Sequence, residues 1–94
     1  MLRIESLEVA DHILEKIEGK HGVSFTEVEE ACLSDRRHIR RGREGLYKVF
    51  GQAATGRYLL VVLVDLSGSN WRVATAREMT SSERRLYIKA MGGR

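Results

Sequence analysis

The sequence RYLLVVLVDLSGSNWRVATAREMTSSE, residues 57–83, decides the fold. Within it, residues 59–66 form an apolar run rich in valine and leucine whose one charge is Asp65, which predicts a buried central strand rather than a helix. The polar residues 67–70 predict a tight turn. The chain then returns as a second strand over residues 71–78, so this stretch predicts an antiparallel hairpin at the centre of a sheet.

A helix is predicted after this hairpin. Thr80 and Glu83 have the spacing of a capping box, in which the Thr80 hydroxyl accepts a backbone hydrogen bond and Glu83 reaches back, so the helix begins near Ser81. Four residues at helical spacing are expected to face inward: Leu86, Tyr87, Ala90 and Met91.

Two helices are predicted in the first third of the chain. Apolar residues recur at helical spacing from Val9 onward, and Gly19 or Gly22 supplies the end of that helix. Ser24 and Glu27 form a second capping box, which starts a second short helix. The residues around Gly22 therefore lie in a tight turn between two helices.

The remaining strands complete the predicted fold class. Residues 46–53 predict a strand that turns into the central one, and residues 2–5 indicate a short first strand. We predict an α+β fold with a small antiparallel sheet of three to four strands, two N-terminal helices and one C-terminal helix, in a single domain over residues 1–94.

Composition excludes several classes of protein. No apolar stretch approaches the roughly 20 residues of a membrane-spanning helix, and the N-terminus has no basic-then-apolar signal segment, so we expect a cytoplasmic protein. One cysteine, Cys32, excludes an internal disulfide and a cysteine metal cluster, and it is expected to be a small core residue. The sequence predicts no metal site and no cofactor.

The charge is divided unevenly along the chain. Residues 1–35 hold 3 basic and 9 acidic side chains, whereas residues 36–94 hold 13 basic and 4 acidic ones. Five arginines within residues 36–43 must lie on an edge strand or a loop, because so many guanidinium groups cannot be buried. This arginine band either contacts RNA or is a solvated edge that resists aggregation, and the basic half as a whole is typical of a nucleic-acid or phosphate binder, although solubility alone also favours charged surfaces. The candidate nucleic-acid-binding residues are Arg36, Arg37, Arg40, Arg41, Arg43 and Lys48.

Three motifs resemble those of the BrnT toxins of bacterial type II toxin–antitoxin pairs. They are KHGVSF at residues 20–25, GRYLLVV at residues 56–62 and WRVATAREMTSSERRLY at residues 71–87. The resemblance spans about residues 11–89 and departs from the family before the first helix, where the family commonly has an aromatic residue followed by an acid. It implies a RelE-like fold whose helices pack on one face of a small antiparallel sheet while the other face binds RNA.

The resemblance also implies an activity, which is metal-independent RNA cleavage that inhibits translation and is silenced by a BrnA-like antitoxin. A dimer or a toxin–antitoxin heterotetramer is the expected assembly. The family's basic pair on the last strand falls on Arg77 and Arg72, and its Lys-His-Gly turn falls on Lys20 and His21. These four residues are the candidate catalytic residues.

The chemistry of such a cleavage suits these residue types. The 2′-hydroxyl attacks the neighbouring phosphate, so the protein must remove its proton, stabilise charge on the phosphorane and protonate the leaving 5′-oxygen. Arginine suits the second task because its planar fork contacts two phosphate oxygens, and histidine exchanges protons near neutral pH. In a regularly alternating strand, Arg72 and Arg77 point to opposite faces, so both reach one phosphate only if a bulge redirects one of them.

Each candidate also has a structural interpretation. His21 with Gly22 terminates a helix, and Lys20 is a solvated cation at a helix end. Glu78 is expected to pair with an arginine rather than to act as a base. The three aromatic candidates for proton donation or base stacking are more often core residues: Tyr47, Trp71 and Tyr87.

A non-catalytic function is the alternative. A domain of the same fold and charge could bind RNA, or serve as a protein-interaction module, without the groups needed for proton transfer. Cleavage separates these functions better than salt dependence does, because any phosphate-binding protein responds to salt.

Overall fold

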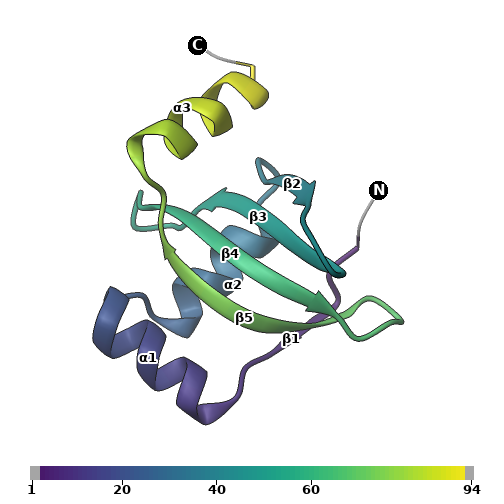
Figure 1. The fold of residues 1–94 in the computed structure, drawn as a ribbon. Helices are drawn as coiled ribbons and strands as arrows, with labels where there is room; N and C mark the ends of the chain where they lie inside the picture. The colour runs from purple at the N-terminus through teal and green to yellow at the C-terminus, as the bar shows by residue number, and fades with distance from the viewer. Residues whose placement is uncertain (1–2, 93–94) are drawn as a thin grey trace.

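The computed structural model describes residues 3–92, which fold into a mixed sheet with helices on both faces (Figure 1). In chain order the elements are β1 Ser6–Glu8, α1 Asp11–His21, α2 Phe25–Leu33, β2 His38–Arg41, β3 Leu46–Gln52, β4 Tyr58–Asp65, β5 Asn70–Glu78 and α3 Ser81–Ala90. The predicted α+β class is confirmed. No helix in residues 3–92 has the length and apolar character to cross a membrane.

The sheet has one strand more than predicted. Its order is β1-β5-β4-β3-β2, in which β4 is central and β1 pairs with β5 in parallel, while the other neighbours are antiparallel. The predicted purely antiparallel sheet is therefore wrong at this edge. The first strand also lies at Ser6–Glu8 rather than over residues 2–5, of which residue 2 lies outside the described chain. Strand β1 has three residues and is held by backbone pairing to residues 70–72, so its sequence shows almost no local pattern from which a strand could be predicted.

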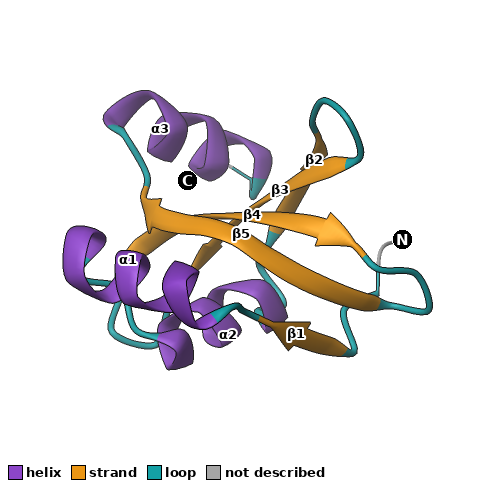
Figure 2. Cartoon of the chain, turned by 60° about the horizontal axis from the view of Figure 1, so that its bottom comes forward, coloured by secondary structure: helices purple, strands orange, loops and turns teal. Residues whose placement is uncertain are grey.

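Helices pack on both faces of the sheet, and the cores that they enclose differ in size. Helices α1 and α2 cover one face and enclose the main core, and α3 lies on the opposite face (Figure 2). The main core includes Ile17 and Val28 from the helices and Leu59, Val61, Leu63, Trp71 and Val73 from the sheet. A smaller cluster beneath α3 consists of Phe50, Leu60 and Tyr87. The resemblance placed the helices on one face, but α3 instead covers part of the other.

The predicted helix ends are confirmed for all three helices. Ser24 and Thr80 each accept a hydrogen bond in a complete capping box. Gly22 ends α1 in the left-handed conformation, at φ 64°, and its N–H donates to Glu18. In α3 the prediction fails for Leu86 and Ala90, which are exposed, because α3 rests on the sheet through Tyr87, Ile88 and Met91.

Gly51 lets α2 approach the sheet. It lies next to the last residue of β3, opposite Leu59, and a Cβ atom placed there would lie 2.3 Å from the carbonyl oxygen of Ala31 in α2. Only a glycine permits this approach of helix backbone to strand backbone.

Candidate nucleic-acid interface

A β-bulge in β5 brings the two candidate arginines to the same face of the sheet. Thr75 pairs with Val62 and Val73 pairs with Leu63, so Ala74 between them has no partner on β4. The extra residue reverses the alternation. Arg72 therefore lies opposite Val64 and Arg77 opposite Leu60, on the face that carries α3. The regular strand that would have separated the two arginines is not present.

The two arginines are not side by side. Their partners on β4 are four residues apart, which corresponds to about 13 Å along a strand. Each also pairs with its own carboxylate, Glu8 for Arg72 and Glu83 for Arg77. The two guanidinium groups therefore do not form one cluster.

Arg77 is held in a bidentate ion pair by the cap of α3. Its Nη1 and Nη2 donate to the two carboxylate oxygens of Glu83 at 2.8 and 2.9 Å, and Nη1 also donates to the Glu78 carbonyl at 3.0 Å. The hydrogen bond from Arg77 lowers the pKa of Glu83 to about 2, and the same bond raises the pKa of Arg77. Glu83 thus occupies one edge of the guanidinium plane and leaves the Nε and Nη2 edge for a second bidentate ligand.

Arg72 lies beside a hollow that contains a histidine. Its Nε and Nη2 donate to one oxygen of Glu8 at 3.0 and 2.9 Å. Both residues line a hollow of about 490 Å³ between β1, α1 and the bulge, together with His12 and Ala74. His12 had no recognisable partner in the sequence, because the pairing of β1 with β5 that brings it there is not encoded locally.

An open basic surface lies between these sites. Arg40, Lys48, Val62 and Thr75 stand opposite one another on four adjacent strands, on the face that carries Arg72 and Arg77. Arg40 and Lys48 are exposed, and neither makes an ion pair within residues 3–92. We call Arg40, Lys48, Arg72 and Arg77 the basic sheet face.

The other predicted RNA contacts are dispersed. Arg36 donates to the Met91 carbonyl at 3.2 Å and Arg37 to the Cys32 carbonyl at 2.7 Å, so these two hold the ends of α3 and α2. Arg41 projects to the face that α1 and α2 cover, over the ring of Tyr47. Arg43 lies exposed in the turn between β2 and β3. The expectation that the band lies on an edge strand is confirmed by β2.

Lys20 and His21 belong to the opposite layer of the molecule. They form the last turn of α1, on the face of the sheet that α1 and α2 cover. No hydrogen bond or ion pair within residues 3–92 links them to Arg72 or Arg77. The helix-ending function of Gly22 is confirmed, through backbone hydrogen bonds rather than through the imidazole of His21. The structure does not gather the four catalytic candidates into one cluster.

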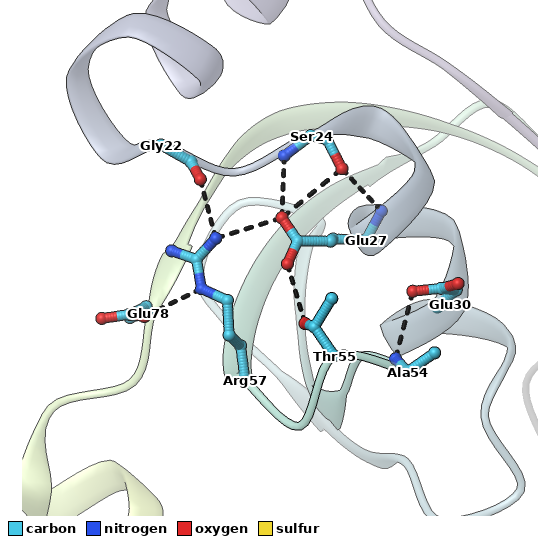
Figure 3. Close-up of polar contacts among 8 residues, drawn as sticks. All are labelled: Gly22, Ser24, Glu27, Glu30, Ala54, Thr55, Arg57 and Glu78. Carbon is cyan, nitrogen blue, oxygen red and sulfur yellow. Dashed lines mark hydrogen bonds and ion pairs between the residues drawn. The ribbon is translucent and has the colours of Figure 1, made fainter.

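Arg57 holds this turn against the end of the sheet (Figure 3). Its Nη1 donates to the Gly22 carbonyl at 2.7 Å and to Glu27 at 3.1 Å, while Nε donates to Glu78 at 2.9 Å. The Glu78 hydrogen bond, followed by Glu27, raises the pKa of Arg57. Sequence analysis did not single out Arg57, although its place in the GRYLLVV motif marks it.

The structural interpretation is confirmed for the other candidates. Trp71 and Tyr87 are each 3% exposed, and Tyr87 donates to the Arg36 carbonyl at 2.5 Å. Glu78 pairs with Arg57, and Cys32 is buried, where desolvation raises the pKa of its thiol to about 12. Tyr47 packs edge-on against Trp71. Residues 3–92 contain no group of three or more histidine, cysteine or acidic side chains placed to hold a metal ion.

Comparison with solved structures supports the fold. The chain is similar to the crystal structure of the Brucella abortus ribonuclease toxin BrnT, with a TM-score of 0.69 and 14% sequence identity, over 81% of this chain and 97% of that one. No family model and no curated protein matches the sequence. The resemblance read from the three motifs is thus confirmed at the level of the fold.

Proposed function

We propose that this protein is a ribonuclease toxin that cleaves RNA on its basic sheet face without a metal ion. The observation that carries the proposal is the bulge at Ala74, which places Arg72 and Arg77 on one face of a fold shared with a ribonuclease toxin. A structure in which the two pointed to opposite faces would not support a common RNA surface.

Arg77 is proposed to stabilise the transition state. Its Nε–H and the second Nη2–H, for which residues 3–92 supply no acceptor, can donate two parallel hydrogen bonds to the phosphorane, while Glu83 holds the other edge fixed. A guanidinium fixed in this way needs little reorganisation as negative charge develops. Arg40, Lys48 and Arg72 then hold the phosphates on either side.

Two sets of residues are candidates for the proton transfers. Lys20 and His21 come from the family motif, but they lie in α1, on the side of the sheet opposite the basic sheet face. His12 and Glu8 line the hollow beside Arg72, where α1, β1 and the bulge meet. A base takes the 2′-hydroxyl proton and an acid returns one to the 5′-oxygen, and histidine suits either task near neutral pH.

The expected biological setting follows from the same resemblance. RNA cleavage would inhibit translation in a bacterial cytoplasm, and a BrnA-like antitoxin would silence it in a toxin–antitoxin complex. An acidic segment of that partner would cover the basic residues of β2 and the sheet face, since opposite charges at an interface guide association. Co-purification with the product of the adjacent reading frame tests this partner.

The deciding experiment is RNA cleavage in EDTA by the purified protein. We expect wild type to produce discrete fragments and Arg77→Lys to reduce the rate about 10²–10³-fold, because lysine keeps the charge but lacks the planar fork. Arg3→Ala is the matched control, since it removes an exposed arginine that pairs with Glu5 and lies away from the basic sheet face. Equal cleavage by wild type and Arg77→Lys refutes the function of Arg77.

RNA binding without cleavage is the second candidate. It is favoured by the neutralisation of Arg72 and Arg77 by Glu8 and Glu83, which leaves Arg40 and Lys48 as the cations without ion pairs on the basic sheet face. If no RNA is cut, with or without translating ribosomes, while binding weakens on replacing Lys48, this second function is correct.

A further inference from the structure

The outer edge of β2 exposes backbone groups that pair with no other strand in residues 3–92. β2 ends the sheet on the side far from β1 (Figure 1). The Gly42 N–H donates to the Leu46 carbonyl at 2.7 Å, which makes them a hydrogen-bonded pair in the antiparallel ladder. Since such pairs alternate, Arg40 also faces β3, and the N–H and C=O groups of Ile39 and Arg41 point outward.

Two hollows flank this edge, one on each face of the sheet. The first, of about 540 Å³, is lined by Leu33, Ile39 and Tyr47. The second, of about 660 Å³, lies towards α3 and is lined by Leu86, Ala90 and Ile39. Leu33 and Leu86, 54% and 38% exposed, are the large apolar side chains that residues 3–92 leave exposed. Each of the two therefore lies beside β2, on opposite faces.

The rim of both hollows is basic. Arg41 lines both, while Arg40 and Lys89 line the second. None of these three makes an ion pair within residues 3–92. An edge strand normally avoids pairing by presenting charge, but the charges on β2 itself are all positive and adjoin partly apolar hollows, with Asp35 among the residues that line the first one. That combination rejects a basic strand and attracts an acidic one.

We propose that β2 is the docking site for an extended acidic segment of a partner protein, which adds a strand to the sheet and places one apolar side chain in each hollow. Neighbouring residues of a strand point to opposite faces, so two adjacent apolar residues flanked by acids fit. A second copy of this chain fits poorly, because antiparallel pairing of β2 with β2 sets arginines against arginines. The inference rests on the proposed protein partner and does not depend on RNA cleavage.

The probe is a fluorescent peptide, Glu-Glu-Leu-Leu-Glu-Glu with blocked ends, followed by fluorescence anisotropy. We expect saturable binding to the wild-type protein, about tenfold weaker binding when both leucines are serine, and no binding when lysine replaces glutamate. Methylating alternate backbone nitrogens of the peptide tests the strand pairing from the ligand side.

A matched pair of variants tests it from the protein side. Arg41→Ala removes the charge and keeps the outward N–H, whereas Arg41→Pro also removes that N–H without touching the ladder to β3. We expect Arg41→Pro to bind the peptide about tenfold more weakly than Arg41→Ala. Leu33→Ser and Leu86→Ser should each weaken binding about fivefold and leave RNA cleavage unchanged. Lys16→Ala, on the exposed side of α1, is the control.

Several outcomes overturn the proposal. Equal peptide binding by Arg41→Pro and Arg41→Ala excludes strand addition. A wild-type dimer that Arg41→Pro dissociates means that a second copy occupies the edge. If the variants weaken binding of an oligouridylate but not of the peptide, the edge contacts RNA instead. Peptide binding without cleavage refutes only the ribonuclease, and cleavage without peptide binding refutes only the docking site.

Discussion

The ion pair of Glu83 with Arg77 should make the stability of the protein depend on acid pH. The replacement Glu83→Gln keeps a side chain of the same shape at the cap of α3 but removes the charge that holds Arg77. The pKa of Glu83 is about 2 against an ordinary value of 4.5, a difference that converts to about 3.4 kcal/mol of free energy of unfolding. Because the Arg77 side chain is 37% exposed, solvent screening reduces this to about 1–2 kcal/mol.

The direction of the pH effect follows from the lowered pKa. A carboxyl group that is more acidic in the folded than in the unfolded state stabilises the fold above about pH 4.5, and that stabilisation is lost as the pH falls towards 2. In urea denaturation, the variant should therefore be about 1–2 kcal/mol less stable than wild type at pH 6, and the gap should nearly vanish by pH 2.

A control and a refuting result complete this test. Glu15→Gln removes an exposed acid of α1 that pairs with no residue in the described chain, and it should change stability by less than about 0.5 kcal/mol. If the difference in free energy of unfolding between wild type and Glu83→Gln stays constant between pH 6 and pH 2, the carboxylate acts through its shape and not through its charge.

Three further predictions concern the core and its supports. Gly51→Ala should lower the free energy of unfolding in urea by about 2–3 kcal/mol, because its Cβ would meet the Ala31 carbonyl oxygen at 2.3 Å. Gly19→Ala, in an exposed part of α1, should raise it by up to about 1 kcal/mol. Equal effects of the two substitutions would contradict the close approach. The Cys32 thiol, with a pKa of about 12, should resist a thiol reagent until urea unfolds the chain, and rapid native labelling would contradict its burial. Arg57→Met should cost about 2 kcal/mol by thermal or urea denaturation, since it leaves a 12% exposed carboxylate without its cation; an unchanged midpoint would mean that the network contributes nothing.

The parts of the fold that sequence analysis predicted are those with local causes. Two capping boxes, the left-handed Gly22 and the apolar run at residues 59–66 each depend on neighbours in the chain, and each is found where predicted. Strand β1 depends instead on pairing with residues 70–72, and its three residues carry no period. The inward face of α3 is predicted correctly at Tyr87 and Met91 and wrongly at Leu86 and Ala90, because its partner surface, Phe50 and Leu60, is brought together only by the sheet.

The candidate site shows the same division. Residue types and family motifs indicated Arg77 and Arg72 as candidates. Whether the two share a face of the sheet depends on the bulge at Ala74, which no residue in WRVATARE predicts. Arg36 and Arg37 read as free cations in a basic band, yet each donates to a backbone carbonyl at a helix end. The carbonyls that a long side chain reaches are set by tertiary packing, so composition overstates the number of arginines available to RNA.

The arrangement around β2 links the two proposed interactions of the protein. The backbone of Arg40 faces β3, but its side chain lies on the basic sheet face, directly opposite Lys48. An acidic strand bound to the outer edge of β2 would therefore bring carboxylates beside the two cations on that face that pair with no acid in residues 3–92. Since RNA binding depends on neutralising phosphate charge, such a strand would weaken it without covering Arg77. Silencing would then require only a short segment at the sheet edge, and by thermodynamic reciprocity bound RNA would weaken the partner by the same factor.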